Sequence, residues 1–262
     1  MTYNTIALST DNRGVATLTL NRPEKHNALS AGMIAELTDA ADEIARNASI
    51  RVVILTGAGE SFCAGGDLGW MREQFAADRA GRMAEARKLA AMLGALDTLP
   101  KPLIGRVQGQ AFGGGIGMMS VCDVVIAADH ARFGLTETRL GLIPATISPY
   151  VAARMGPKLR EVFMSARLFD ADEAVRLGLA ARTVPANGLD EAIEAEVKPC
   201  LAAAPGAVAR AKALARGLSS GIDEQVIEQT VTALADAWES PEAQEGITAF
   251  FDKRKPGWAG GG

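Results

Sequence analysis

The chain has 262 residues, of which 48% are hydrophobic and 22% charged, with a formal net charge of −4. This length is enough for one large domain or two small ones with a core that needs no disulfide or metal, and the acidic balance argues against an extended nucleic-acid surface. The three cysteines have no CxxC spacing, and with only two histidines they do not suggest a metal site, so reduced thiols are expected.

The N-terminal stretch "MTYNTIALSTDNRGVATLTL" contains no basic region followed by an apolar one, and no apolar run is long enough to cross a bilayer. These patterns predict a cytoplasmic protein with no membrane and no nucleic-acid partner.

The first half of the chain alternates between strand and helix patterns. Residues 15–20 alternate in polarity and, with residues 4–8, predict an opening hairpin. Ser30 is placed to cap a helix that continues through Glu43. Residues 51–59 form a short apolar run that ends in glycines, as expected of a strand covered on both faces, and residues 79–96 have helical spacing.

Two more strands are predicted in "PLIGRVQG" and "CDVVIAAD", with a Gly-rich helix start between them. Strands that alternate with helices in this way predict an α/β fold. After about residue 185 the pattern changes to three Ala-rich amphipathic segments at 189–203, 205–218 and 223–238. We therefore predict a core over residues 1–185 and a helical region over residues 186–262.

Two Gly-rich stretches, "FCAGGDLGWM" and "GQAFGGGIGMMSVCD", each lead into a predicted helix. Neither has the spacing of a phosphate-binding loop or of a dinucleotide-binding fingerprint. One explanation is close packing of a helix on a sheet, which glycine allows. The other is a pair of exposed backbone N–H groups, best placed at Ala64 and Gly114, that together bind one developing oxyanion.

These stretches, together with "NRPEKHNALS", "VVILTGAGESFCAGGDL" and the ending "ITAFFDKRKPGWAG", resemble the enoyl-CoA hydratase/isomerase (crotonase) superfamily. The resemblance runs in the same order from Ile6 to about Trp258. It implies a spiral of ββα units, a C-terminal helical trimerisation region, and a homotrimer or a hexamer made of two trimers. It also implies an acyl-CoA thioester substrate whose carbonyl oxygen binds the N–H groups of Ala64 and Gly114, with coenzyme A as part of the substrate and no separate cofactor.

The resemblance places the proton-transferring carboxylate at Glu137, in "FGLTETRLG". A carboxylate at this point would move protons at Cα or Cβ while the two N–H groups stabilise the enolate. The alternative for a single glutamate in a polar loop is a solvated side chain without a chemical role.

Typical hydratases of this family carry a second glutamate on the helix after the Gly-rich loop, where this chain has Gly117. Three functions therefore stay open. Glu137 alone could add water across the double bond, or it could shuttle one proton in a Δ3/Δ2 isomerase, or the chain could be an acyl-CoA-binding homologue without activity. Decarboxylation or thioester hydrolysis would use the same oxyanion site.

The stretch from Thr136 to Gly156 is similar to bacterial hydratases of the methylglutaconyl-CoA type, which favours hydration of a short or branched acyl group. A distal carboxylate on that group could be received in an acyl pocket that includes Gly117 and four polar residues. The four polar residues are Arg139, Thr146, Ser148 and Tyr150. Their alternative roles are helix capping and core packing.

The resemblance also implies two binding segments for coenzyme A. Phe250 and Lys253 match positions that reach the adenine and the 3′-phosphate, usually from a neighbouring subunit, and an aromatic face with a lysine suits such a ligand. Asp67 is also expected to cap the helix that follows it. The remaining predicted contacts lie in the first polar loop and the first Gly-rich stretch and are Arg22, Lys25, His26, Gly65, Gly66 and Asp67.

Overall fold

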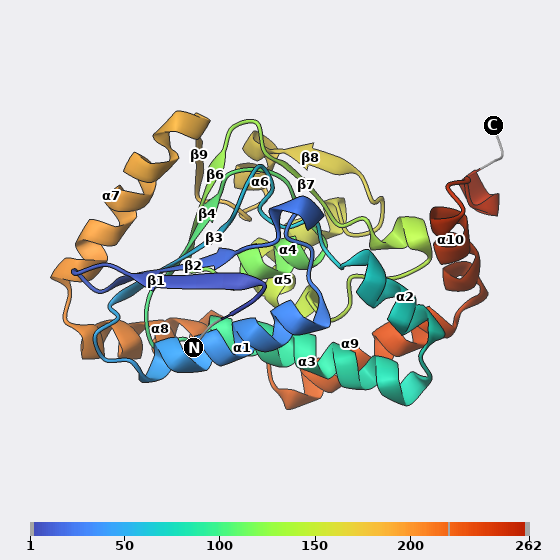
Figure 1. The fold of residues 1–262 in the computed structure, drawn as a ribbon, viewed down its shortest axis with the longest axis horizontal. Helices are drawn as coiled ribbons and strands as arrows, with labels where there is room; N and C mark the ends of the chain where they lie inside the picture. The colour runs from blue at the N-terminus through green and yellow to red at the C-terminus, as the bar shows by residue number, and fades with distance from the viewer. Residues whose placement is uncertain (1–2, 220, 260–262) are drawn as a thin grey trace.

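The computed structural model describes residues 3–219 and 221–259. Its main feature is a six-stranded sheet with the order β1-β2-β3-β4-β6-β9 (Figure 1). β1 and β2 form an antiparallel hairpin, and every later neighbour pair in this sheet is parallel. The six strands are β1 (Ile6–Thr10), β2 (Val15–Leu20), β3 (Val52–Gly57), β4 (Leu103–Val107), β6 (Val124–Ala128) and β9 (Arg182–Val184).

The sheet is covered on both faces, which is why β3 is an almost continuous apolar run. On one face α7 (Leu189–Ala202) packs over β3, β4 and β6 through a separate hydrophobic cluster that includes Ile104, Ile126 and Ile193. On the other face lies the main core, to which α1 (Ala31–Arg46) and α3 (Arg79–Asp97) contribute.

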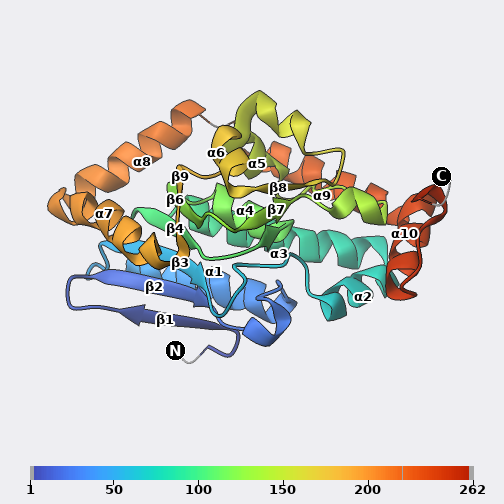
Figure 2. The same ribbon diagram turned by 90° about the horizontal axis from the view of Figure 1, so that it is seen from above.

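A layer of long helices lies beneath the sheet, where α1, α3 and α9 (Glu224–Glu239) run side by side (Figures 1 and 2). The predicted cap of α1 is confirmed, since Ser30 Oγ accepts a hydrogen bond from Met33 N at 3.3 Å. Such a cap satisfies an N–H group that has no partner within the helix.

A second, three-stranded sheet with the order β5-β7-β8 stands next to the main one. It consists of β5 (Ala111–Phe112), β7 (Arg132–Gly134) and β8 (Leu168–Asp170). Each of β4 and β6 is followed by a strand of this small sheet and then by a helix, namely α4 (Gly114–Ser120) and α5 (Ser148–Met155). This gives the predicted repetition of ββα units, so the expected α/β fold is confirmed.

The described chain after β9 is helical and contains α7, α8 (Pro205–Ser219), α9 and α10 (Pro241–Phe251). The first three of these match the predicted segments closely, whereas α10 was not predicted. α10 lies at one end of the molecule beyond α2 (Leu68–Ala76) (Figures 1 and 2). Within the described residues, no helix has the length and apolar character needed to cross a membrane.

Candidate active site

The two Gly-rich stretches lie side by side, as a shared site requires. Cys63 forms a parallel bridge with Ala111, which precedes α4, and Leu29 forms another with Gly66. The Leu29 side chain also reaches the second stretch, because a Cβ built on Gly114 would lie 2.6 Å from Leu29 Cδ1. The backbone of both stretches therefore surrounds one small region.

The amide of Ala64 is not available as an oxyanion donor, which corrects the prediction from sequence. It donates to the carbonyl oxygen of His26 at 2.9 Å. Two residues further on, Gly66 N has no acceptor among residues 3–219 and 221–259, and neither has Gly114 N. The free amide of the first stretch is thus that of Gly66, and with Gly114 at the start of α4 it makes the candidate donor pair. The sequence shows no side chain at either position, but it does not show which N–H group the His26 carbonyl engages.

The loop that engages Ala64 has an uncommon backbone conformation. His26 and Asn27 both have positive φ angles, of 50° and 54°. Asparagine tolerates this region better than most residues, and here the fully buried Asn27 side chain donates to the carbonyl oxygens of Ala58 and Ser61 at 2.9 and 2.8 Å. These bonds fix the loop against the turn that connects β3 to the first Gly-rich stretch.

Glu137 begins the short 3₁₀ turn η2 (Glu137–Leu140) that follows β7. Its side chain reaches the start of α4, because a Cβ built on Gly113 would lie 2.8 Å from Glu137 Oε1. Its Oε2 is buried and has no hydrogen-bond partner in the described structure. The carboxyl group therefore lies against Gly113, the residue that precedes α4, with its Oε2 shielded from solvent.

Burial raises the pKa of Glu137 from its ordinary 4.5 to about 7. Burial destabilises the carboxylate relative to the neutral acid, and a hydrogen bond from the backbone amide of Glu137 offsets this only in part. A group with a pKa near neutrality can both accept and release a proton, which is the property that a general acid–base catalyst needs.

Arg22 and Asp67 bind each other at 3.0 Å beside the first Gly-rich stretch, and both are largely buried. Asp67 Oδ1 also accepts from Gly69 N and Trp70 N at 2.8 and 3.2 Å, which confirms that it caps α2. Burial favours the neutral acid, but these two amides and Arg22 outweigh it and lower the pKa of Asp67. The pair ties the first polar loop to the segment that carries Gly66.

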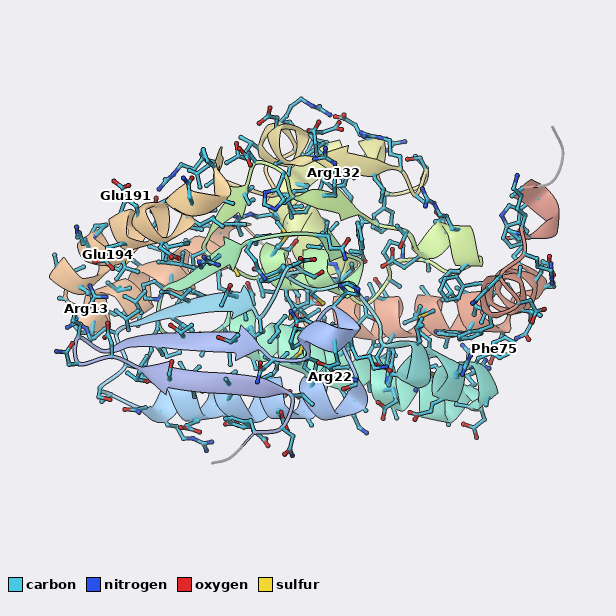
Figure 3. All side chains as sticks on the ribbon, turned by 45° about the horizontal axis from the view of Figure 1, so that its top comes forward. Arg13, Arg22, Phe75, Arg132, Glu191 and Glu194 are labelled. Atoms are coloured by element: carbon cyan, nitrogen blue, oxygen red, sulfur yellow. The ribbon has the colours of Figure 1, made fainter. Side chains whose placement is uncertain are left out.

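The other predicted coenzyme A contacts lie at separate places in one chain. Lys25 and His26 are exposed in the first loop, where His26 Nδ1 lies 2.9 Å from Ser61 Oγ. Gly65, with φ of 93°, packs against the Phe112 carbonyl. Phe250 and Lys253 are exposed at the end of α10, whereas Arg22 lies near the middle of the molecule (Figure 3).

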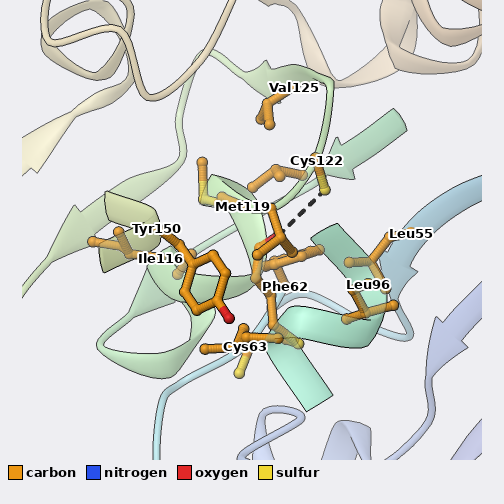
Figure 4. Packing of buried hydrophobic residues seen from close by; sticks show 14 of the residues in the cluster. Leu55, Phe62, Cys63, Leu96, Ile116, Met119, Cys122, Val125 and Tyr150 are labelled. Atoms are coloured by element: carbon orange, nitrogen blue, oxygen red, sulfur yellow. Dashed lines mark hydrogen bonds between the residues drawn. The ribbon is translucent and has the colours of Figure 1, made fainter. Parts of the chain in front are cut away.

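The predicted acyl-pocket residues differ in their availability. Ser148 Oγ donates a hydrogen bond to the Ala145 carbonyl oxygen at 2.6 Å, and Arg139 is exposed. Tyr150 lies in the main core near Ile116 and donates weakly to Ala90 O at 3.4 Å (Figure 4). Burial, with Asp97 nearby, raises the pKa of Tyr150 to about 12. Only the Thr146 hydroxyl is both buried and without a partner in the described chain.

Gly117 lies in α4 with no space for a side chain. A Cβ at this position would lie 2.6 Å from Ile147 Cγ2, closer than real contacts allow. The glycine is thus matched to Ile147, a residue that the sequence did not single out.

The first Gly-rich stretch contains a fully buried thiol, Cys63. Within residues 3–219 and 221–259, no group of three or more His, Cys, Asp and Glu side chains is placed to bind a metal. Burial raises the pKa of Cys63 to about 12, so this thiol is neutral rather than nucleophilic at physiological pH.

The chain is similar to known proteins over nearly its whole length. The family model described as enoyl-CoA hydratase/isomerase matches residues 10–261. A short-chain-enoyl-CoA hydratase of Clostridium acetobutylicum is 32% identical over 266 residues, covering 97% of each chain. The crystal structure of an enoyl-CoA hydratase from Shewanella pealeana has a TM-score of 0.80 at 38% identity and covers 97% of this chain and 96% of the other.

A second crystal structure, of an enoyl-CoA hydratase from Mycobacterium avium, has a TM-score of 0.87 at 29% identity, over 97% of this chain and 98% of the other. The family model and these relatives extend over nearly the whole chain and both Gly-rich stretches. The chain therefore belongs to the enoyl-CoA hydratase/isomerase family of enzymes.

Proposed function

We propose that this enzyme hydrates a short or branched α,β-unsaturated acyl-CoA, with Glu137 as its only acid–base group. The observation that carries the proposal is the buried Glu137 carboxyl, whose Oε2 has no protein partner and whose pKa is raised to about 7. A buried polar atom without a partner is uncommon, and it is expected where a ligand or a reacting water supplies the missing bond.

In the proposed reaction the thioester oxygen binds the N–H groups of Gly66 and Gly114. As negative charge develops on this oxygen, the two amides stabilise the enolate. The Glu137 carboxylate takes a proton from water while the water oxygen bonds to Cβ. The resulting acid then gives a proton to Cα as the enolate returns to the thioester. One water is consumed, and Glu137 ends in the form in which it began.

The missing second carboxylate supports this single-residue mechanism. In this chain the space near Gly117 is occupied by Ile147, so no second carboxylate can transfer protons from that position. The same observation supports the second candidate, a Δ3/Δ2 isomerase, in which Glu137 removes a proton from C2 and returns it to C4 without water. Thr146, with its free hydroxyl, and Arg139 are the candidates to bind a distal carboxylate in a branched substrate.

The test follows the absorbance of the conjugated thioester. Addition of crotonyl-CoA or methylglutaconyl-CoA should cause a decrease if the enzyme hydrates, whereas a 3-enoyl-CoA should cause an increase if it isomerises. Glu137→Gln should lower kcat by about 10²–10⁴-fold, the usual contribution of acid–base catalysis, with little change in acyl-CoA binding. If Glu137→Gln turns over at near the wild-type rate, or if neither substrate changes while both bind, the proposal is wrong.

A further inference from the structure

The space next to Gly117 is filled by a side chain from another element. A Cβ on Gly117 would lie 2.6 Å from Ile147 Cγ2 and 3.0 Å from Ile147 Cβ. Leu93 Cδ1, from α3, would be 3.7 Å away. Ile147 therefore occupies the volume into which a longer residue 117 would project.

This volume lies one helical turn from the reacting groups. Gly117 N donates to Gly113 O at 3.1 Å, so the two residues are separated by the first turn of α4. The Glu137 carboxyl lies against Gly113, and Ile147 lies against Gly117. One turn of an α-helix rises by about 5.4 Å, a distance that only a few carbon atoms span.

Ile147 is held firmly in this position. It is 3% exposed and belongs to the main hydrophobic core together with Leu93. Its carbonyl oxygen accepts the Val151 amide at 3.1 Å, at the start of α5. Because isoleucine is branched at Cβ and the interior is close-packed, this side chain cannot swing aside as a methionine could.

We infer that Ile147, supported by Leu93, forms the floor of the acyl pocket and determines the length of acyl chain that the enzyme accepts. The inference rests on the proposed function, because it assumes that the thioester binds between Gly66 and Gly114. An acyl chain that leads from there past Glu137 along α4 meets the Ile147 side chain after a few carbons. Short acyl groups fit above it, and a longer straight chain collides with it.

The experiment compares kcat/KM for crotonyl-CoA and trans-2-octenoyl-CoA in the wild type and in Ile147→Ala. The variant should raise the octenoyl-to-crotonyl ratio by about tenfold or more, since added methylenes in an apolar pocket discriminate at about this level. The matched control is Ile44→Ala, an equally buried isoleucine on α1 whose loss should weaken the core without changing the ratio. An unchanged ratio in folded Ile147→Ala would refute the inference.

Two further measurements keep the result decisive. If Ile147→Ala does not fold, Ile147→Val should still raise the octenoyl-to-crotonyl ratio. An unchanged ratio in Ile147→Val would contradict the inference. Isothermal titration with butyryl-CoA and octanoyl-CoA tests pocket depth without any reaction. If the wild type turns over no enoyl-CoA but Ile147→Ala or Ile147→Val gains octanoyl-CoA affinity, the proposed function fails and the pocket floor stands. If neither variant gains affinity for octanoyl-CoA, Ile147 does not form the floor of the acyl pocket.

Discussion

Glu137 shows how the environment of one residue determines its chemistry. The side chain lacks any donor to its Oε2, and burial raises its pKa to about 7. In the proposed hydration the enzyme needs the carboxylate to take a proton from water. The protonated form, which dominates below the raised pKa, is therefore inactive.

We expect kcat/KM for crotonyl-CoA to fall about tenfold per pH unit below about pH 7, as one protonation predicts. The measurement is a pH–rate profile of the wild type between pH 5 and 9, on the order of four units wide around that pKa. A profile that stays flat down to the ordinary pKa of a glutamate would contradict the assignment of Glu137.

The same pKa predicts a difference in stability. Because burial raises the folded-state pKa, the folded protein binds a proton that the unfolded chain releases, so stability decreases as the pH rises from about 4.5 to about 7. Glu137→Gln has no charge to bury and should avoid this loss, which amounts to about 3 kcal/mol for the full shift. Melting temperatures of both proteins at pH 5 and pH 8 check this, and the advantage of the variant should appear only at the higher pH.

The sequence predicts which residues belong to the candidate site better than it predicts which groups they form hydrogen bonds with. The motif around Glu137 and the bare Gly-rich stretches are visible in the sequence. The choice between Ala64 and Gly66 as donor is not, because it depends on where the His26 carbonyl lies after two left-handed residues. Tyr150 and Ser148 resemble polar pocket residues in the sequence, but the fold uses their hydroxyls for contacts within the protein.

At the scale of elements, α10 supports the turn that carries Glu137. Gly246 packs on the backbone of Leu140, and a Cβ on this glycine would lie 2.5 Å from the Leu140 carbonyl carbon. Gly141 packs equally closely on the backbone at the start of α10. A satellite hydrophobic cluster that includes Leu142, Trp238 and Ile247 completes this contact. The position of η2 therefore depends on α10, the last α-helix of the described chain.

Gly246→Ala should lower the stability by about 1–3 kcal/mol through overpacking and displace η2. Displacement of a catalytic group by about 1 Å can cost about 100-fold, so we expect kcat to fall by up to that factor. Thermal unfolding and steady-state kinetics provide the measurements.

The matched control is Gly217→Ala on α8, where an added Cβ would meet no atom within 4 Å beyond its chain neighbours and the nearby backbone of its own helix. This change should stabilise the protein by about 0.5–1 kcal/mol and leave kcat unchanged. Equal kinetics in the two variants would show that α10 does not position Glu137.

Strong periodicity made most elements predictable. The hairpin, α1, α3 and the first three C-terminal helices appear within a few residues of their predicted ends. The short strands β5, β7 and β8 are too brief for an alternation to show, and their pairing depends on contacts distant in sequence. α10 carries an internal glycine, Gly246, that lowers its helical signal and is explained only by the Leu140 backbone beside it.

At the scale of the whole molecule, the two predicted coenzyme A segments lie in different parts of the chain, in the first polar loop and at the end of α10. Arg22 lies near the middle and α10 at one end, with α2 between them (Figure 3). The family resemblance predicts that the second segment reaches the ligand of a neighbouring subunit, so we expect a trimer or a hexamer. Light scattering should give three or six times the chain mass of 27.3 kDa.

If Lys253 binds the 3′-phosphate, Lys253→Ala should raise KM for crotonyl-CoA by about tenfold, the effect of losing one charge-assisted bond of about 1.5 kcal/mol. It should leave kcat unchanged. Crotonyl-pantetheine, which lacks the adenosine and its phosphates, serves as the control substrate and should show no difference between variant and wild type. An equal effect on both substrates would assign Lys253 to a structural role instead.

The tight match between residues 117 and 147 also constrains the evolution of this enzyme. A mutation that restores glutamate at residue 117 would clash with Ile147, and a mutation that first removes the isoleucine would leave a void in the core. Each single change should therefore lower the stability of the folded protein. Residues 117 and 147 should therefore change together in evolution rather than one at a time.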